Sequence, residues 1–361
     1  MRGNVRFLRG KTQPGTRFLA VVKADSYGHG IIACTRATAE AGSDGVAVVT
    51  AEEAVCLRDA GFEGRILVMG PLYDNDQYSE MAGRNVEFAI VSDEMAQMVQ
   101  ELGSTGPRVR IHLKIDTGMH RQGLLPEEAR LFLGDIRGHS RIDLVGVMTH
   151  FASAAEDPAS IDSQLDRFLP LVQLAKADWP EALAHAANSA ATICCPRAHL
   201  DMVRCGIAIY GLSPGQGDAQ AEGLTPVLSW TSRVALVKRV PAGEGVGYGL
   251  TFRPSEDTHV ALVPAGYADG VFRLLGNRGQ VLIGGRRYPM VGRVSMDSFG
   301  VDVGNESRVR TGDRVTLIGQ DLNSRLSAED LAGWAETINY EITCNIGLDR
   351  AQRVFVNDSQ T

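Results

Sequence analysis

Short apolar runs alternate with longer segments of helical periodicity from the N-terminus to about residue 212. Eight runs have the length and composition of buried strands and occupy residues 18–22, 45–49, 65–69, 86–91, 109–115, 144–148, 183–187 and 202–209. Helical patterns lie between most of them, as at 51–60, 93–102, 126–136 and 161–176. This repeat predicts a parallel (β/α)₈ barrel. An open doubly wound sheet is the alternative, disfavoured because no G-x-G-x-x-G follows the first strand.

The pattern changes after Leu212. Residues 213–223 read as a Gly/Ala-rich polar linker, and the chain beyond it contains short β-type runs at 227–240, 259–263, 279–283, 287–291, 299–303 and 313–318. A helix is expected at 327–338, with Ser327 and Asp330 as a capping box. The sequence therefore predicts two domains, a barrel over 1–222 and a mostly antiparallel β domain over 223–361.

Composition narrows the class of protein. The chain has 361 residues, 44% hydrophobic and 22% charged, which is ordinary for a globular protein. Its net charge of −7 argues against a nucleic-acid or anionic-membrane surface, and no apolar run is long enough to span a bilayer. Six scattered cysteines without C-x-x-C spacing indicate reduced thiols in a cytoplasmic protein, with no zinc site or disulfide frame.

Polar residues follow the predicted barrel strands where each strand ends, which is where barrel active sites lie. They are Lys23 and Tyr27 after the first strand, Lys114 and Arg121 at the fifth, His150 after the sixth, Asn188 and Ser189 after the seventh, and Arg204 and Gly206 in the eighth. A lysine in a low-dielectric strand end is a candidate nucleophile or Schiff-base former.

Each of these residues also has an ordinary explanation. Lys23 could extend to solvent from a strand end, and His150 could be a hydrogen-bonded core histidine. Arg204 is the strongest single signal, because a buried guanidinium is costly unless it is paired, although a structural ion pair would serve equally well. In the second domain, Tyr267 lies in a glycine-flanked turn and Met296 and Asp297 follow an apolar run, which is typical of turns in general.

Seven motifs become specific when taken together and in order. They are VKADSYGHG at 22–30, LKIDTGMHR at 113–121, MTHF at 148–151, HAANS at 185–189, VRCGIAIYG at 203–211, GYADG at 266–270 and GRVSMD at 292–297. In this order they resemble the bacterial alanine racemases over nearly the whole chain. The resemblance implies a barrel that binds pyridoxal 5'-phosphate, a β domain, and a head-to-tail homodimer with shared active sites.

The resemblance also implies residue roles at the cofactor. Lys23 would form the internal aldimine with pyridoxal phosphate, and Tyr27, Ser189 and the backbone N–H groups of Gly206 and Ile207 would hold the phosphate. His150 and Asn188 would complete the cofactor site. Arg204 would face the pyridine nitrogen, leaving the ring a weaker electron sink and favouring reprotonation at Cα.

At the substrate, the resemblance implies two bases on opposite faces of Cα, which are Lys23 for D-alanine and Tyr267 of the partner subunit for L-alanine. Arg121 would contact the cofactor ring hydroxyl and the substrate carboxylate. Met296 of the partner subunit would bind that carboxylate through its backbone N–H and bound a small pocket, and Asp297 would belong to the same substrate site. Lys114 would be carbamylated and would orient Arg121. The expected activity is interconversion of L- and D-alanine, supplying D-alanine for peptidoglycan, with no metal.

The match has departures. His120 and Gln122 flank Arg121 where Gly and Leu are common, Ser298 replaces a common Gln, and Leu348 stands near the place of a phosphate-contacting tyrosine. Family members usually carry a strand-bearing segment before the helix expected near Met1. The alternatives are a serine or broad-specificity racemase of the same fold, a related barrel-type decarboxylase, and a non-enzymatic single-barrel pyridoxal-phosphate carrier.

Overall fold

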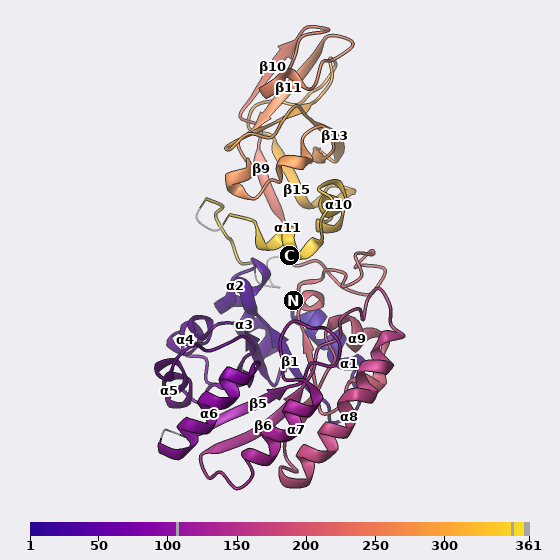
Figure 1. Cartoon of the computed structure of the whole chain (residues 1–361). Coiled ribbons are helices and arrows are strands. Elements are labelled where there is room, and N and C mark those ends of the chain that lie inside the picture. Colours follow the sequence, from indigo (N-terminus) through magenta and orange to yellow (C-terminus); the bar gives the residue numbers. More distant parts are fainter. Residues whose placement is uncertain (106–107, 348–349, 357–361) are drawn as a thin grey trace. The chain divides into compact units, whose positions relative to one another are not determined.

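The computed structural model describes residues 1–105, 108–347 and 350–356 (Figure 1). The chain forms two compact units, one of residues 1–215 with 223–225 and the other of residues 216–222 with 226–361. In the described part of the chain, no helix combines the length and apolar character that crossing a membrane requires.

The first unit is a closed barrel of eight strands in which neighbours pair in parallel and β8 returns to β1. The strands are β1 (Arg17–Val21), β2 (Gly45–Val48), β3 (Arg65–Val68), β4 (Glu87–Ile90), β5 (Val109–Lys114), β6 (Ile142–Met148), β7 (Leu183–His185) and β8 (Met202–Cys205). Every residue of β2, β4 and β8 is buried, as expected for parallel strands covered on both faces. The barrel prediction is confirmed, and the open-sheet alternative is wrong.

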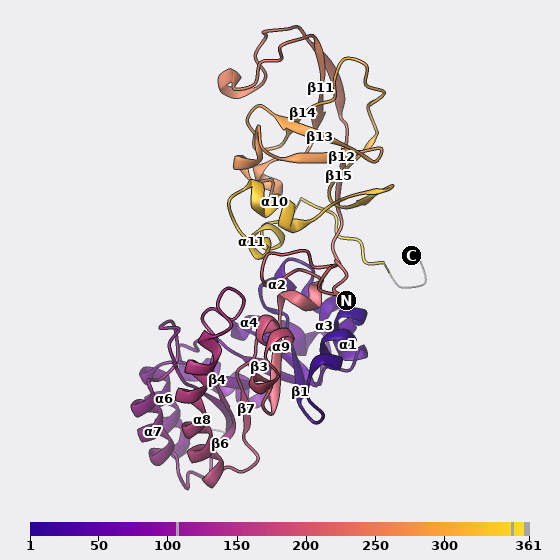
Figure 2. The ribbon, with the colours of Figure 1, turned by 90° about the vertical axis from the view of Figure 1, so that its right-hand side faces the viewer.

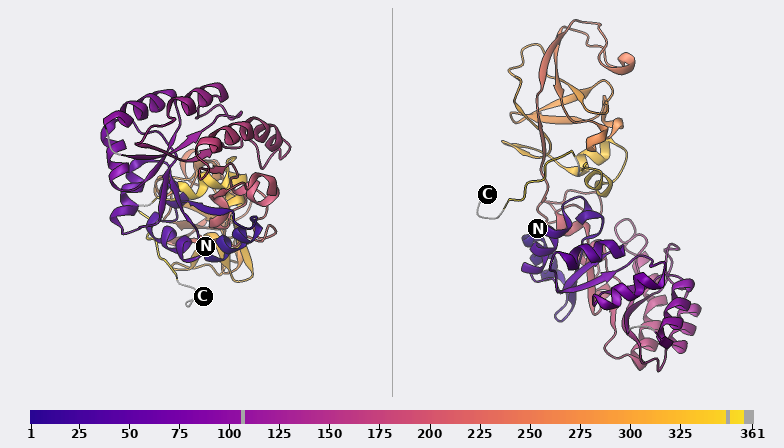
Figure 3. Two further views of the ribbon diagram at one scale, coloured as in Figure 1. Left: turned by 90° about the horizontal axis from the view of Figure 1, so that it is seen from below. Right: turned by 90° about the vertical axis from the view of Figure 1, so that its left-hand side faces the viewer.

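Helices surround the barrel strands on the outside (Figures 1 and 3). They are α1 (Arg2–Lys11), α3 (Ile31–Glu40), α4 (Ala51–Asp59), α5 (Asn75–Gly83), α6 (Asp93–Thr105), α7 (Pro126–Asp135), α8 (Ser160–Asp178) and α9 (Ser189–Cys194), with the short 3₁₀ helix η1 (Pro196–Ala198). Local sequence explains their starts. Thr50 and Glu53 form a capping box at α4, and Pro126 occupies the first turn of α7.

The eighth apolar run does not continue as a strand to residue 209. β8 ends at Cys205, and Ile207–Tyr210 forms the 3₁₀ helix η2. Gly206 separates the two with φ −106° and ψ −100°, a backbone conformation outside the strand region. Apart from Arg204, the run is apolar on both sides of Gly206 because both segments are buried, so hydrophobicity alone could not mark this boundary.

The second unit contains a sheet with the order β10-β11-β14-β13-β12-β15-β16, and β9 pairs with β15 (Figure 2). All of its pairs are antiparallel, which confirms the mostly antiparallel domain. The strands are β9 (Trp230–Arg233), β10 (Leu236–Val240), β11 (Thr258–Val263), β12 (Gln280–Ile283), β13 (Arg286–Val291), β14 (Phe299–Asp302), β15 (Arg314–Asp321) and β16 (Ser324–Leu326).

The run at 227–240 divides into two strands instead of one. Val234 N–H donates to Asp313 beside β15, whereas Ala235 N–H donates to Leu262 of β11. The chain therefore changes pairing partner between these two residues, and the strand is interrupted there. The sequence shows no break because both halves carry β-type residues.

Short helices complete this unit. They are η3 (Tyr248–Leu250), η4 (Tyr267–Asp269), η5 (Arg273–Leu275), α10 (Ala328–Trp334) and α11 (Asn339–Cys344). The expected Ser327–Asp330 capping box is present at α10, but the helix ends at Trp334, earlier than predicted. The six cysteines, all among the described residues, form no disulfide.

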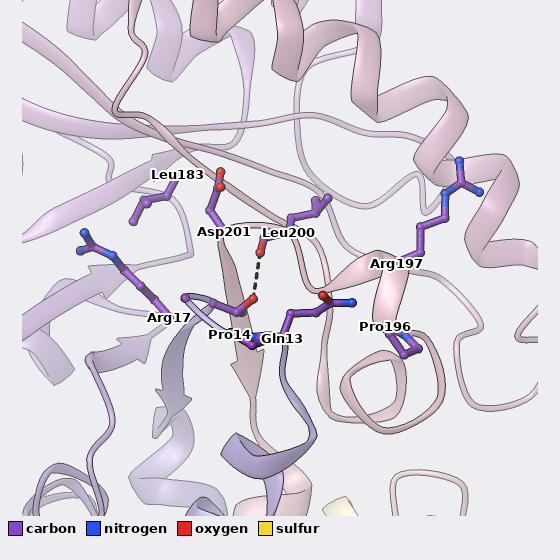
Figure 4. A pocket seen from close by; sticks show the side chains of 10 residues that line it. Gln13, Pro14, Arg17, Leu183, Pro196, Arg197, Leu200 and Asp201 are labelled. Carbon is purple, nitrogen blue, oxygen red and sulfur yellow. Dashed lines mark hydrogen bonds between the residues drawn. The ribbon is translucent and has the colours of Figure 1, made fainter.

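An open pocket lies at the amino ends of β1, β7 and β8 (Figure 4). Its lining includes Arg17, Leu183 and Asp201, and Thr16 Oγ1 donates to the carbonyl of Leu200 across it (3.1 Å). None of the predicted site residues lines this pocket. In barrels of this kind the amino-end face serves stability, and the carboxyl ends of the strands carry the chemistry.

Candidate active site

Lys23 opens a turn of unusual backbone conformation directly after β1. The turn, labelled α2 (Lys23–Tyr27), has positive φ at Ala24, Asp25, Ser26 and Tyr27, between 50° and 58°. A left-handed turn of residues that carry a Cβ costs ~1–2 kcal/mol per residue. Such strain persists only where the surroundings over-determine it, and it clusters at functional sites.

Two carboxylates hold this turn in place. Glu53 Oε1 accepts from Ala24 N–H (2.6 Å), and Asp25 Oδ1 accepts from Ile31 N–H at the start of α3 (2.7 Å). Within the turn, Gly28 N–H donates to the carbonyl of Ala24 (3.0 Å). Lys23 is therefore presented by a fixed loop instead of a regular helix.

Tyr27, Ser189 and Gly206 converge at the ends of β1, β7 and β8. Ser189 Oγ accepts from the N–H groups of Gly206 (3.0 Å) and Ala208 (3.4 Å). A Cβ on Gly206 would lie 2.4 Å from the Tyr27 hydroxyl, so a side chain here would displace that hydroxyl. Hydroxyls and backbone N–H groups at this part of a barrel form a usual phosphate site. In the structure, the side chain of Asn188 caps α9 by accepting from Ala191 N–H (3.0 Å).

Arg204 lies inside the barrel with 3% of its surface exposed and has no carboxylate partner among the described residues. Nη1 donates to His185 Nδ1 (2.9 Å) and to the His185 carbonyl (3.0 Å). Nη2 faces the carbonyls of Thr149 (2.8 Å) and Ala186 (3.1 Å) and His150 Nδ1 (3.2 Å). The Nε–H group makes no hydrogen bond within the described chain. Burial lowers the pKa of Arg204 to about 10, so it remains charged at neutral pH.

Three ionisable side chains continue inward from Arg204, and the sequence reading missed all three. His185 Nε2 contacts His112 Nδ1 (2.8 Å), and His112 Nε2 contacts Glu87 Oε2 (2.9 Å). Arg65 and Arg110 form ion pairs with the other oxygen of Glu87 (3.3 and 2.7 Å). The available signal was a carboxylate and two histidines inside otherwise apolar strand runs.

Lys114, at the end of β5, is buried with 6% of its surface exposed. Burial, and then the charges of Arg204 and Arg121, lower the pKa of Lys114 to about 7. Its Nζ donates to Gln122 Oε1 (2.9 Å), so the glutamine that departs from the family pattern contacts this lysine. The charge of Lys23 acts on it as well, which indicates that these cations gather on one rim of the barrel.

The turn after β5 carries Arg121 and is organised by Asp116. Asp116 Oδ1 accepts from the N–H groups of Gly118, Met119 and His120 (2.9, 3.0 and 3.1 Å). His120 has a φ of 53°, a conformation that glycine adopts without cost and histidine tolerates better than most residues. Arg121 is exposed at this turn.

His150 follows β6 and lies among the same positive charges. Because Arg204 can only donate, His150 Nδ1 accepts its hydrogen bond, and the proton of the neutral ring is on Nε2. Burial, followed by the charges of Arg204 and Lys114, holds the pKa of His150 well below its usual range. His150 is therefore neutral at working pH.

In the second unit, residues 266–270 form a tight turn, here named the Tyr267 turn. Tyr267 N–H donates to the Ser295 carbonyl and Ala268 N–H to the Met296 carbonyl (both 3.0 Å), which joins the turn to the segment that carries Asp297. A Cβ on Gly266 would lie 2.1 Å from the Met296 carbonyl oxygen. Tyr267 and Met296 are 47% and 52% exposed.

Arg350 links the Tyr267 turn to the segment that carries Asp297 through two ion pairs. Its Nε pairs with Asp269 (3.1 Å) and its Nη2 with Asp297 (2.8 Å). Asp269 also accepts from Gly266 N–H (2.8 Å). Asp297, predicted from the family as a substrate-site residue, thus takes part in an ion pair of its own unit. Leu348 lies outside the described residues.

Comparison with known proteins agrees with this two-part arrangement. Residues 1–214 match the family model for the alanine racemase N-terminal domain, and residues 227–355 match that for the C-terminal domain. The chain belongs to the alanine racemase family. This is a family of isomerases, and the assignment excludes the decarboxylase and single-barrel carrier alternatives.

Individual members of the alanine racemase family match over nearly the full chain. The alanine racemase of Symbiobacterium thermophilum is 42% identical over 96% of this chain and 92% of its own length. The solved alanine racemase of Streptomyces coelicolor A3(2) has a TM-score of 0.93 at 37% identity, covering 99% of this chain and 96% of that one. That of Bacillus anthracis with bound L-Ala-P has a TM-score of 0.86 at 34% identity, covering 96% and 90%.

Proposed function

We propose that the protein is a pyridoxal-phosphate-dependent alanine racemase that interconverts L- and D-alanine. The observation that carries this is the buried Arg204, whose other donors are all occupied while its Nε–H has no partner among the described residues. This N–H is a donor without an acceptor in the described chain, and the ring nitrogen of the cofactor is an acceptor that would take its hydrogen bond. A guanidinium holds its proton, so the nitrogen it faces stays unprotonated.

The residues at the ends of β7 and β8 fit the phosphate of the same cofactor. The hydroxyls of Ser189 and Tyr27 and the Ile207 N–H would donate to it. The Gly206 N–H, which donates to Ser189 Oγ at 3.0 Å, would turn to the phosphate, and the missing Cβ of Gly206 leaves room beside Tyr27. Lys23, on its fixed turn, would hold the cofactor covalently, with His150 near the ring and Asn188 fixing the start of α9. When bound, pyridoxal phosphate stabilises the electron pair left at Cα after proton removal.

Racemisation requires a proton to leave one face of Cα and another to arrive on the opposite face. Lys23 Nζ would serve the face from which D-alanine loses its proton. The hydroxyl of Tyr267 of the partner subunit would serve the other face. His150, neutral with its proton on Nε2, could donate a hydrogen bond to a tyrosinate and so lower that tyrosine's pKa toward working pH.

A head-to-tail homodimer is part of this proposal. Tyr267 and Met296 are about half exposed in their own unit, as residues that complete another subunit's site would be. Arg121 would bind the substrate carboxylate, while Met296 and Asp297 would bound a pocket that suits a methyl group and penalises larger side chains. A carbamate on Lys114 would supply an anion beside Arg121. The product D-alanine would serve peptidoglycan synthesis.

Proton NMR in heavy water tests the activity and its substrate together. The cofactor-loaded protein is given L-alanine, and the loss of the Cα proton signal is followed alongside a chiral assay of the product. We expect exchange with formation of D-alanine, and neither in Lys23→Ala. Absence of exchange with cofactor bound would refute the proposal.

L-serine is the matched second substrate in this assay. His120 and Gln122 stand beside Arg121 where the family commonly has other residues, and Gln122 contacts Lys114, so the site near the carboxylate is altered in this chain. Faster exchange at serine than at alanine would assign a serine or broad-specificity racemase. Faster exchange at alanine would retain the first assignment.

A further inference from the structure

The side chains of Glu87, His112, His185 and Arg204, here named the buried relay, form one continuous hydrogen-bonded line through the barrel interior. They come from β4, β5, β7 and β8, and each is 0–3% exposed. The three contacts between them measure 2.9, 2.8 and 2.9 Å. Only Arg204 belongs to the proposed cofactor site.

The chemistry of its two ends fixes the direction of every hydrogen bond. Arg204 can only donate, so His185 Nδ1 accepts and its proton is on Nε2. His185 Nε2 then donates to His112 Nδ1, which places the proton of His112 on Nε2, and this donates to Glu87. Both histidines are neutral in the same tautomer, and Glu87 is ionised.

The surroundings support these protonation states. Burial lowers the pKa of His112 and of His185, which keeps both rings neutral. Burial alone would raise the pKa of Glu87, but the hydrogen bond from His112 and the charges of Arg65 and Arg110 hold it below its usual value. An ionised Glu87 is therefore a permanent acceptor at the end of the relay opposite Arg204.

The barrel is shaped around one member of the relay. A Cβ on Gly146 of β6 would lie 2.1 Å from His112 Nδ1, so the ring rests against bare backbone. The register between β5 and β6 also shifts between Ile111 and His112. A bulge and a glycine next to an active site re-aim a side chain, and here they give the imidazole its place.

We propose that Glu87 and His112 are positioning residues for the cofactor site: they fix the tautomer of His185, which holds Arg204 so that its Nε–H remains the donor available to the cofactor. This inference rests on the proposed function. In the opposite tautomer, His185 Nδ1–H would face an Arg204 N–H at 2.9 Å, and the guanidinium would have to move. Glu87 acts only through its neighbours and touches no reacting atom.

Two substitutions of His112 form a matched pair. His112→Phe removes the acceptor that His185 Nε2–H requires, whereas the side-chain oxygen of His112→Asn can replace Nδ1 as that acceptor. Tyr78→Phe is the control, because Tyr78 is fully buried against Phe88 of β4 and its hydroxyl has no hydrogen-bond partner in the described chain. Glu87→Gln is the fourth variant and keeps an acceptor without the charge.

Nitrogen-15 NMR of histidine-labelled full-length protein reads the tautomers directly, with and without pyridoxal phosphate. We expect His112 and His185 to carry their protons on Nε2 in the unsubstituted protein. The dissociation constant and absorption maximum of bound pyridoxal phosphate are measured on the same samples. His112→Phe should weaken binding about tenfold, the value of one buried hydrogen bond, and shift the absorption maximum.

In His112→Asn, most of the cofactor affinity lost in His112→Phe should return. The affinity of Glu87→Gln should lie between those of His112→Phe and His112→Asn, and that of Tyr78→Phe should equal that of the unsubstituted protein. A Nδ1–H tautomer at either histidine in the unsubstituted protein would overturn the inference. So would equal effects of His112→Phe and Tyr78→Phe, or a normal absorption maximum and affinity in His112→Phe. Should His112→Phe fail to fold, Glu87→Gln decides by the same measurements. Failure of the unsubstituted protein to bind pyridoxal phosphate would instead refute the proposed function.

Discussion

Around Arg204 the polar side chains are buried and bonded to one another, whereas the Tyr267 turn is held by backbone hydrogen bonds and leaves Tyr267 and Met296 about half exposed. Low dielectric strengthens the interactions of the first region and makes any unpaired group there costly. The second region is held by its backbone and by the surface ion pairs of Arg350 with Asp269 and Asp297. In the proposed function, the barrel of the partner subunit supplies the surroundings that the Tyr267 turn lacks.

This difference separates two tasks. In the proposed function, the barrel site would hold a cofactor before any substrate arrives, because its donors and charges are fixed by packing. The Tyr267 turn would position one reactive hydroxyl, whose protonation state would depend on the partner subunit's surface. Substitutions in the two regions should therefore fail in different ways.

The largest effect is expected from Tyr267→Phe. Removing a general acid–base group typically costs a factor of about 10²–10⁴ in rate, so L-alanine should lose its Cα proton that much more slowly. Pyridoxal phosphate should bind normally, because the barrel residues are unchanged. Stopped-flow rates and a cofactor titration measure the two. Loss of cofactor binding in this variant would contradict the separation of the two regions.

Lys114→Met should stabilise the protein by removing a buried charge from among Arg204, Arg121 and Lys23. The ordinary lysine pKa of 10.5 falls to about 7 in the folded chain. Between these values the unfolded chain binds the proton and the folded chain does not, so the stability of the parent protein falls as pH falls through this window and is level below it. The variant lacks this dependence.

Denaturant titrations from pH 10 to pH 7 in carbon-dioxide-free buffer measure the difference in unfolding free energy between Lys114→Met and the parent. At about 1.4 kcal/mol per pH unit, it should grow to about 4 kcal/mol at pH 7. Added bicarbonate should stabilise the parent alone if Lys114 is carbamylated as proposed, because its neutral amine would react with carbon dioxide to give a carbamate and a proton. A constant difference across the window would show that Lys114 keeps an ordinary pKa.

Gly206→Ala tests the phosphate part of the barrel site. The added Cβ would lie 2.4 Å from the Tyr27 hydroxyl and would displace it. We expect pyridoxal phosphate affinity to fall about tenfold to a hundredfold, the loss of one or two hydrogen bonds to a charged group. Gly134→Ala in α7 is the control, since its Cβ meets nothing within 4 Å. Unchanged affinity in Gly206→Ala would remove Tyr27 and Gly206 from the proposed site.

Much of this arrangement is visible in the sequence. The eight apolar runs predicted the barrel because each strand is buried on both faces, and chemistry at strand ends follows from the fold itself. The buried relay was not predicted from the sequence because Glu87, His112 and His185 lie within strands. The interior partner of a polar side chain depends on which strands meet across the barrel. That pairing is a tertiary property.

Backbone conformation was also beyond the sequence. Residues with a Cβ disfavour a left-handed turn, so the sequence of Ala24 to Tyr27 does not indicate one. The bond that Glu53 accepts from Ala24 N–H comes from a later helix and is not visible in the local sequence. Two predicted strands also end where the backbone changes course. One ends at Gly206, and the other is interrupted at Ala235, where the chain changes its pairing partner. Hydrophobicity reports burial and does not report where a buried chain changes direction.

The smallest expected effect is that of Arg350→Gln, which would loosen the Tyr267 turn without touching the barrel. Arg350 bridges Asp269 and Asp297 at the protein surface, where such pairs contribute little and are screened by salt. We expect kcat for alanine to fall about twofold to fivefold at low ionic strength, and parent and variant to converge at high salt. Arg278→Gln, which removes the exposed pair with Glu336, is the matched control and should leave kcat unchanged. Because cofactor affinity belongs to the barrel, it should be equal in all three proteins, and a parallel loss of affinity in Arg350→Gln would mean that the two regions are not energetically separate.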